Sequence, residues 1–269
     1  MATASPTKQP TSGEKPSANP KSTLSLAPTS TLGIKYAVGL TGILLSGFVI
    51  FHMLGNLQIF LPPHFINDYA HFLKSNLELL VPARLGLLLV FVVHLGLAMQ
   101  LRIRNASARK TDYQYPRQYQ ESTVSSRSMI ITGLALLFFV VYHLSHFTMG
   151  WIQPADYAGA EANLVASKEL GHVDSPNVFK MVNNDFIAPW NGGTVIDSVI
   201  TASYLLAMVF LGLHMWHGVA SAFQSLGVNA PRWKVWTRSI GYIATIIVIA
   251  GNVLIVTLTY LGLPKWLYG

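Results

Sequence analysis

Four histidines lie inside long apolar segments of this chain, where an imidazole has little water to bond. His52, His94, His143 and His214 each occupy a different segment. An ionisable side chain at membrane depth is costly unless something compensates it, so such a residue marks a functional site by default. An imidazole can ligate a metal or carry a proton. One histidine in each of four consecutive segments calls for a shared explanation, and metal ligation is the first to consider.

The segments that carry these histidines are long enough to cross a bilayer. The chain is 51% hydrophobic and only 11% charged, and its mean hydropathy is +0.42, which is typical of a polytopic membrane protein. A hydrocarbon core of about 30 Å requires about 20 apolar residues in a helix. The sequence therefore predicts an all-α membrane protein with five transmembrane helices, over about residues 33–60, 81–101, 129–151, 194–223 and 240–263.

Residues 1–30 form a separate region, rich in Ser, Thr, Pro, Lys and Ala, with almost no large apolar residue before Leu24. Such a segment cannot bury enough surface to fold, and it lacks the apolar core of a secretory signal. We expect a disordered polar tail at residues 1–30, followed by a single membrane domain over residues 31–269.

Basic residues indicate how the domain is oriented. With the N-terminus inside, the tail, Lys35 at the start of the first span and the loops at 102–127 and 232–238 hold all but five of the 18 Lys and Arg residues. The positive-inside rule then predicts the N-terminus inside and the C-terminus outside. This asymmetry accounts for the net charge of +7 without a nucleic-acid partner. The loop at about 152–193 becomes a cap on the outer face.

This topology assigns a depth to each histidine, at about 1.5 Å of helix rise per residue. His52 and His143 fall in the outer half of the bilayer, whereas His94 and His214 fall in the inner half. Two histidines at each of two levels is the arrangement that two bis-histidine haems require, because each iron takes an axial imidazole from either side. Depth thus favours two b haems, with His94 paired with His214 and His52 with His143. Hydrogen bonding between helices, or a proton relay, is the alternative.

The residues around the histidines carry a family resemblance. The motifs are Phe-His-Met-Leu-Gly-Asn-Leu at His52, Val-Val-His-Leu-Gly-Leu-Ala-Met at His94, Tyr-His-Leu-Ser-His-Phe at His143 and Leu-His-Met-Trp-His-Gly at His214. In this order on five spans, they resemble the dihaem cytochrome b subunit of bacterial succinate dehydrogenase and fumarate reductase, of the single-anchor, five-helix type. The resemblance implies that the first four helices form a haem-binding bundle, the second helix paired with the fourth and the first with the third.

Two of the helices carry a second histidine three residues after the first, namely His146 and His217. Residues at this spacing share a helix face. The resemblance selects the first of each pair, because the family's ligand precedes a glycine by four residues, as His214 precedes Gly218. We expect His146 and His217 to bond haem propionates or a nearby water. A hydrogen bond to a neighbouring helix is the alternative, and exchanged ligation in one helix stays open.

The resemblance implies a membrane anchor and electron-transfer subunit of succinate:quinone oxidoreductase, an enzyme of the tricarboxylic acid cycle, in the bacterial cytoplasmic membrane. The implied partners are a flavoprotein that interconverts succinate and fumarate and an iron–sulfur subunit. Electrons would pass between the iron–sulfur subunit and menaquinone or another quinone through the two haems. Basic residues of the inner loop are candidates for docking these partners, although topology and lipid headgroups explain them equally well: Arg102, Arg104, Arg109, Lys110 and Arg117.

Candidates for a quinone site occur in the outer connection between the first two spans, where protons are available from water. Each is also typical of a solvated loop or helix end: Asp68, His71, Lys74, Glu78 and Arg84. Asp197, at the start of the fourth span, is interpreted as a helix cap.

Three other classes of membrane protein are alternatives to the dihaem cytochrome. The cytochrome b of quinol:cytochrome c reductase carries two ligands on the same helix, about thirteen or fourteen residues apart, and no span here has two histidines at that spacing. The anchor of a hydrogenase or formate dehydrogenase is not excluded by histidine spacing. A proton-coupled transporter with histidine relays is the rival from a different class, and the lack of an evident internal repeat argues against it.

Overall fold

The computed structural model describes residues 30–108, 123–158 and 177–268. These residues are helical and contain no strand. Five helices are long and apolar enough to cross a membrane, which confirms the predicted multi-pass architecture. They are α1 (Thr31–Asn56, continued by the 3₁₀ turn η1, Leu57–Phe60), α3 (Leu77–Ser107), α4 (Val124–Phe147), α7 (Val195–Ser225) and α8 (Pro231–Tyr260). The predicted polar tail and much of the predicted outer loop lie outside the described residues.

Local signals fix where most of these helices begin. Ser30 caps α1 by accepting from the Gly33 amide at 2.9 Å, and Thr123 caps α4 by accepting from the Ser126 amide at 3.1 Å. A free amide at a helix start is satisfied in this way by a short hydroxyl side chain. Pro231 opens α8 at its first position, where the missing N–H of proline has no intrahelical partner to lose.

Several of the predicted helix ends are displaced. The helix α8 begins at Pro231 and not at about 240, α4 begins at Val124 and not at about 129, and α3 ends at Ser107 and not at about 101. Pro82 was expected in the first turn of the second span, whereas α3 begins five residues earlier, at Leu77, and Pro82 lies inside it. The third span was expected to reach Trp151. Instead α4 ends at Phe147, because the chain turns at Gly150, which adopts a positive φ of 66°. This left-handed conformation is accessible to glycine and stops the helix.

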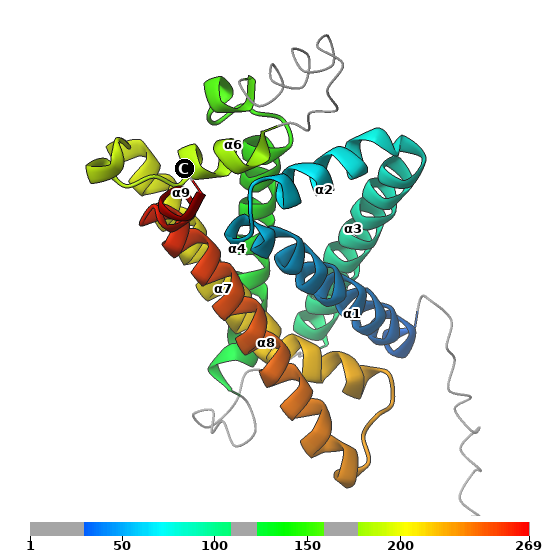
Figure 1. The fold of residues 1–269 in the computed structure, drawn as a ribbon. Coiled ribbons are helices and arrows are strands. Elements are labelled where there is room, and N and C mark those ends of the chain that lie inside the picture. The colour runs from blue at the N-terminus through cyan, green and yellow to red at the C-terminus, as the bar shows by residue number, and fades with distance from the viewer. Residues whose placement is uncertain (1–29, 109–122, 159–176, 269) are drawn as a thin grey trace, which may run out of the picture.

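Short elements gather at one end of the long helices, which we call the cap end (Figure 1). The helix α6 buries Phe179, Met181, Asn183 and Asp185. The amide of Phe179 donates to Asn67 Oδ1 at 3.0 Å and so joins α6 to α2. The cap-end elements are α2 (His64–Ser75), α6 (Val178–Asp185), η2 (Pro189–Asn191) and α9 (Leu263–Tyr268).

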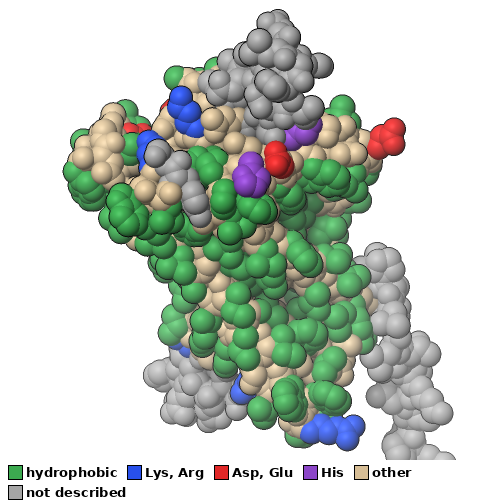
Figure 2. Space-filling model, in the orientation of Figure 1, with side chains coloured by type: hydrophobic (Ala, Val, Ile, Leu, Met, Phe, Trp, Pro, Cys, Tyr) green, Lys and Arg blue, Asp and Glu red, His purple; other side chains and the backbone are tan. Residues whose placement is uncertain are grey.

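The helix α7 lies at the centre of the bundle and packs against α1, α4 and α8. Small residues allow close approach, as membrane helices commonly require. A Cβ at Gly241 of α8 would lie 3.3 Å from the Ala220 nitrogen of α7, and one at Gly39 of α1 would lie 3.1 Å from the Ala222 oxygen. The middle of the molecule is covered by hydrophobic side chains, with charged side chains gathered toward the two ends (Figure 2).

The helix α3 is the exception to this packing. It contacts α1 and α2, whereas its contact with α4 or α7 is slight at most. None of its residues is buried. The bundle is therefore least filled between α3 and the α4–α7 pair, and the histidines of the four helices are found around this region.

Candidate functional site: two pairs of imidazoles

The structure brings His52 of α1 and His143 of α4 together. Their ring centroids are 5.7 Å apart, with the ring planes at 87°. Each ring stacks on a phenylalanine one turn earlier in its own helix, at centroid distances of 5.4 Å for Phe48 and 5.8 Å for Phe139. Because both histidines precede the cap-end termini of their helices by four residues, this pair lies near the cap end.

The second pair consists of His94 of α3 and His214 of α7, which are close enough to interact electrostatically. A threonine from a neighbouring helix holds each ring. His94 Nδ1 lies 3.0 Å from Thr41 Oγ1, and His214 Nδ1 lies 3.2 Å from Thr132 Oγ1. These threonines precede the histidines of the first pair by eleven residues on α1 and on α4, which is about 16 Å of helix rise. The two pairs thus occupy two levels.

Two glycines lie directly against the second pair. A Cβ at Gly42 would meet Cε1 of His94 at 3.3 Å, and a Cβ at Gly133 would meet Cε1 of His214 at 3.4 Å. Each distance is at or within ordinary van der Waals contact, so a larger side chain would displace the imidazole. Glycine lets each ring rest on the backbone of the neighbouring helix, with its other edge left for a ligand.

The donor sets fit haem iron. Each site offers two imidazoles, and among the described residues no group of three or more His, Asp or Glu side chains converges on one point. A porphyrin supplies four iron ligands itself, so a bis-histidine haem takes only two from the protein. With imidazole–metal bonds of about 2 Å, two rings on opposite faces of one metal have centroids about 6 Å apart. The separation of His52 from His143 is close to this value.

A hydrogen-bonded chain extends from the first pair toward the cap. The Tyr204 hydroxyl lies between two histidines, 3.3 Å from His143 Nδ1 and 2.9 Å from His146 Nδ1. His146 is buried, and its Nε2 lies 2.7 Å from Gln153 Oε1 and 3.6 Å from Asp185 Oδ2. Both ring nitrogens of His146 are therefore in contact with protein groups. His217, the other predicted accessory residue, lies within electrostatic reach of Arg238.

Burial favours the uncharged form of the Asp185 carboxyl. Its side chain is 2% exposed, and burial, reinforced by the negative charges of Asp156 and Asp197, raises its pKa to about 8. Its contact with His146 is consequently a polar contact and not an ion pair. Asp197 itself forms a capping box with Thr194 at the start of α7, which confirms its interpretation as a helix cap.

Comparison of the chain with known protein families, curated proteins and solved structures found no match. The site is therefore interpreted from its own residues. Sequence reasoning missed Thr41, Thr132, Tyr204 and Gln153, because single hydroxyls and amides in apolar runs are common. Their spacing from the histidines is the signal that could have found two of them, since Thr41 and Thr132 stand at the same distance before His52 and His143.

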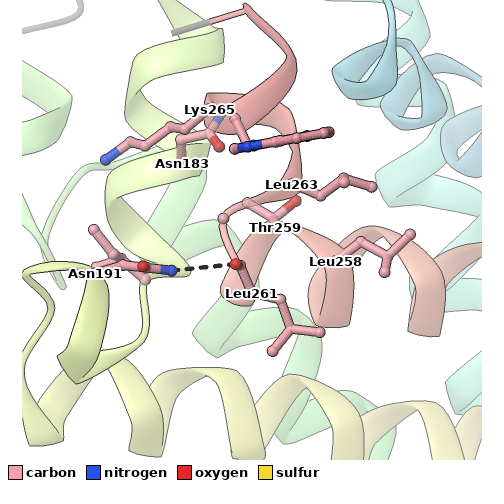
Figure 3. Close-up of a pocket in the computed structure, with 10 residues that line it drawn as sticks. Asn183, Asn191, Leu258, Thr259, Leu261, Leu263 and Lys265 are labelled. Atoms are coloured by element: carbon pink, nitrogen blue, oxygen red, sulfur yellow. Dashed lines mark hydrogen bonds between the residues drawn. The ribbon is translucent and has the colours of Figure 1, made fainter.

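The predicted quinone-site residues lie on α2 and the first turns of α3. A hollow of about 510 Å³ lies elsewhere at the cap end, between α6, η2, the end of α8 and α9 (Figure 3). Asn191 Nδ2 donates to the Leu261 carbonyl there at 3.2 Å. The hollow shares no residue with the predicted quinone set, whose members are Asp68, His71, Lys74, Glu78 and Arg84.

Proposed function

We propose that this chain is a dihaem cytochrome b, the membrane anchor and electron-transfer subunit of a succinate:quinone oxidoreductase. One observation carries the proposal: four helices contribute one imidazole each, with the His52 and His143 rings 5.7 Å apart at one level and His94 and His214 within electrostatic reach of each other at a second level. His94 and His214 would hold the inner haem, and His52 and His143 the outer haem. Haem supplies reversible one-electron chemistry when it is bound.

The protein's own residues orient the ligands. Phe48 and Phe139 restrict the rotation of the rings on which they stack. All four histidines lie on helices that are long and apolar enough to cross a membrane. Two redox sites stacked along the helices would give electrons a route across the membrane, between an inner iron–sulfur partner and a quinone such as menaquinone.

The remaining chemistry is assigned to partner subunits. We propose that a flavoprotein carries out the interconversion of succinate and fumarate and passes electrons through an iron–sulfur subunit. In the proposed orientation, in the bacterial cytoplasmic membrane, the end of α3 faces these partners and presents Arg102 and Arg104. The other proposed docking residues, Arg109, Lys110 and Arg117, lie outside the described residues.

The buried Tyr204–His146–Asp185 contacts favour a second candidate. Adjacent groups that can exchange protons are what a histidine-relay, proton-coupled transporter would need. The cytochrome anchor of a hydrogenase or formate dehydrogenase remains a third candidate, because it would use the same kind of histidine pairs.

The deciding experiment is a haem count on the purified, detergent-solubilised chain by pyridine haemochrome. The proposal predicts two b haems per chain. His94→Ala and His214→Ala should each remove the same haem, and His52→Ala and His143→Ala the other. His64→Ala, on α2 and outside both pairs, is the control that should keep both. A folded chain without haem would overturn the cytochrome and favour the transporter, whereas co-purified subunits and succinate:quinone reductase activity would distinguish the cytochromes.

A further inference from the structure

A short pattern occurs twice in the described helices. It reads Thr-Gly, five residues, Phe, three residues, His, and it spans residues 41–52 of α1 and 132–143 of α4. Leucine and valine also recur within it at matching positions. Such a pattern in two apolar helices could be coincidence if it had no structural counterpart.

The contacts made by this pattern recur as well. Each threonine hydroxyl meets Nδ1 of the histidine on the next transmembrane helix, and each glycine lies against Cε1 of that same ring. Each phenylalanine stacks on the histidine that ends its own copy of the pattern. The helix pairs α1–α3 and α4–α7 thus share a short internal repeat that was not expected from the sequence, and each pair contributes one histidine to each level. The lack of a repeat therefore no longer argues against a transporter.

The hydrogen bonds of the threonines have a defined direction. Thr41 Oγ1 lies 2.7 Å from the Ala37 carbonyl oxygen, and Thr132 Oγ1 lies 3.1 Å from the carbonyl oxygens of Ser128 and Met129. A hydroxyl has one hydrogen to donate, and here it is directed to the helix's own backbone. Toward the imidazole, each threonine can therefore act only as an acceptor.

This direction determines the tautomer of the two rings. Nδ1 of His94 and of His214 must carry the proton that the threonine oxygen accepts. In a neutral imidazole the other nitrogen, Nε2, then keeps its lone pair, which is the form that ligates a metal. A histidine that ligates a metal usually donates its second N–H to an oxygen, which fixes the ring and increases its basicity.

We propose that Thr41 and Thr132 are paired positioning residues for the inner haem, each of which sets the tautomer, orientation and donor strength of one axial histidine. The inference rests on the proposed function, because it assigns His94 and His214 to one iron. Because both threonines act on the same iron, their effects on the midpoint potential of the inner haem add, and the outer haem is unaffected. A more basic axial ligand stabilises ferric iron, so loss of either hydroxyl raises the inner midpoint potential.

The test compares Thr41→Val, Thr132→Val and the double variant with wild type in potentiometric titrations of both haems. Valine keeps the branched shape of threonine and removes only the acceptor. We expect a positive shift of the inner potential in each single variant, a larger shift in the double variant and an unchanged outer potential. Retention of the inner haem should fall by about 10- to 100-fold, as for other partners of metal-bound histidines. Thr41→Ser and Thr132→Ser should restore wild-type behaviour.

Thr245→Val is the matched control. Thr245 is a buried threonine of α8 whose hydroxyl donates to its own backbone, at Gly241, at 2.7 Å. The positioning role would be overturned if the inner midpoint potential shifted no more in the two test variants than in this control, or if the potentials of both haems shifted equally. The presence of two haems would still support the cytochrome.

A haem-free readout separates this inference from the proposed function. Nitrogen-15 spectra of histidine-labelled protein without haem should show His94 and His214 with the proton on Nδ1, assigned by difference from His94→Gln and His214→Gln. The Nδ1–H signal should change in the corresponding valine variant. An unchanged signal would reject the threonine contact whether or not the chain binds haem.

Discussion

At the scale of single residues, the direction of one hydrogen-bond chain follows from its last member. The Asp197 carboxylate accepts from Gln153 Nε2 at 3.0 Å, so the other amide atom of Gln153, Oε1, accepts from His146 Nε2. The remaining nitrogen of His146, Nδ1, then accepts from the Tyr204 hydroxyl. The Tyr204 oxygen is left to accept from His143 Nδ1. His143 is thereby set in the same tautomer as the two histidines held by threonines.

Tyr204→Phe tests this chain. The variant keeps the ring but removes the oxygen that accepts from His143, so the outer haem should be retained about 10- to 100-fold less tightly. The inner haem should be unaffected, which the reduced-minus-oxidised spectrum can resolve. Tyr142→Phe is the control, because the Tyr142 ring packs against Tyr204 and His146. Equal loss of haem in the two variants would contradict the role of the hydroxyl.

Asp185 predicts a pH dependence of stability. The folded carboxyl, with its pKa raised to about 8, keeps a proton that the unfolded carboxyl releases near its ordinary value of 3.8. The folded state binds more protons between these values, so the free energy of unfolding falls as pH rises through this range. The groups facing Asp185 are His146 of α4, Asp197 and Tyr204 of α7, and Asp156.

Asp185→Asn removes this titration and keeps a similar shape. Thermal unfolding in detergent between pH 5 and pH 9 should show the wild-type midpoint falling with pH relative to that of the variant. The difference between the two proteins should level off once the pH exceeds about 8. A difference that does not vary with pH would mean that the folded carboxyl is already ionised.

At the scale of helices, the sequence predicted that the five helices exist and at which level each histidine lies, but not how each helix is rotated about its axis. Five apolar runs gave five helices, and the distance of each histidine from its helix ends gave its level. Helices that are apolar on every side carry little information about which side faces a neighbour. The contacts of Thr41, Gly42 and Tyr204 depend on that rotation, so they came only from the structure. The early start of α3 was missed because Pro82 resembles a helix-starting proline.

Gly42→Leu tests the packing of α1 against α3. A leucine side chain cannot fit where a Cβ alone would meet the His94 ring at 3.3 Å, so the ring must move. We expect loss of the inner haem with the outer haem retained. Gly47→Leu is a matched control on the same helix, because a Cβ at Gly47 has nothing within 4 Å. Loss of the same haem in both variants would show a general effect on the helix.

At the scale of the whole molecule, the two ends of the bundle differ in charge and structure. The cap end carries short elements, among them α2, α6, η2 and α9, whereas the opposite end carries the basic termini of α3 and α8, including Arg102, Arg104, Arg232 and Arg238. The positive-inside rule predicts that this basic end faces the cytoplasm. The His94–His214 pair would then lie nearer the soluble partners, and the His52–His143 pair nearer the outer surface.

Cysteine labelling tests this orientation, because the chain contains no cysteine of its own. Ser75, at the end of α2, and Ser107, at the end of α3, are both exposed and lie at opposite ends of α3. A membrane-impermeant maleimide added to intact cells should label Ser75→Cys, and it should label Ser107→Cys only after the membrane is opened. The reverse pattern would place the cap end in the cytoplasm. The His52–His143 pair would then be the one nearer the iron–sulfur subunit, and the order of electron transfer through the two levels would be exchanged.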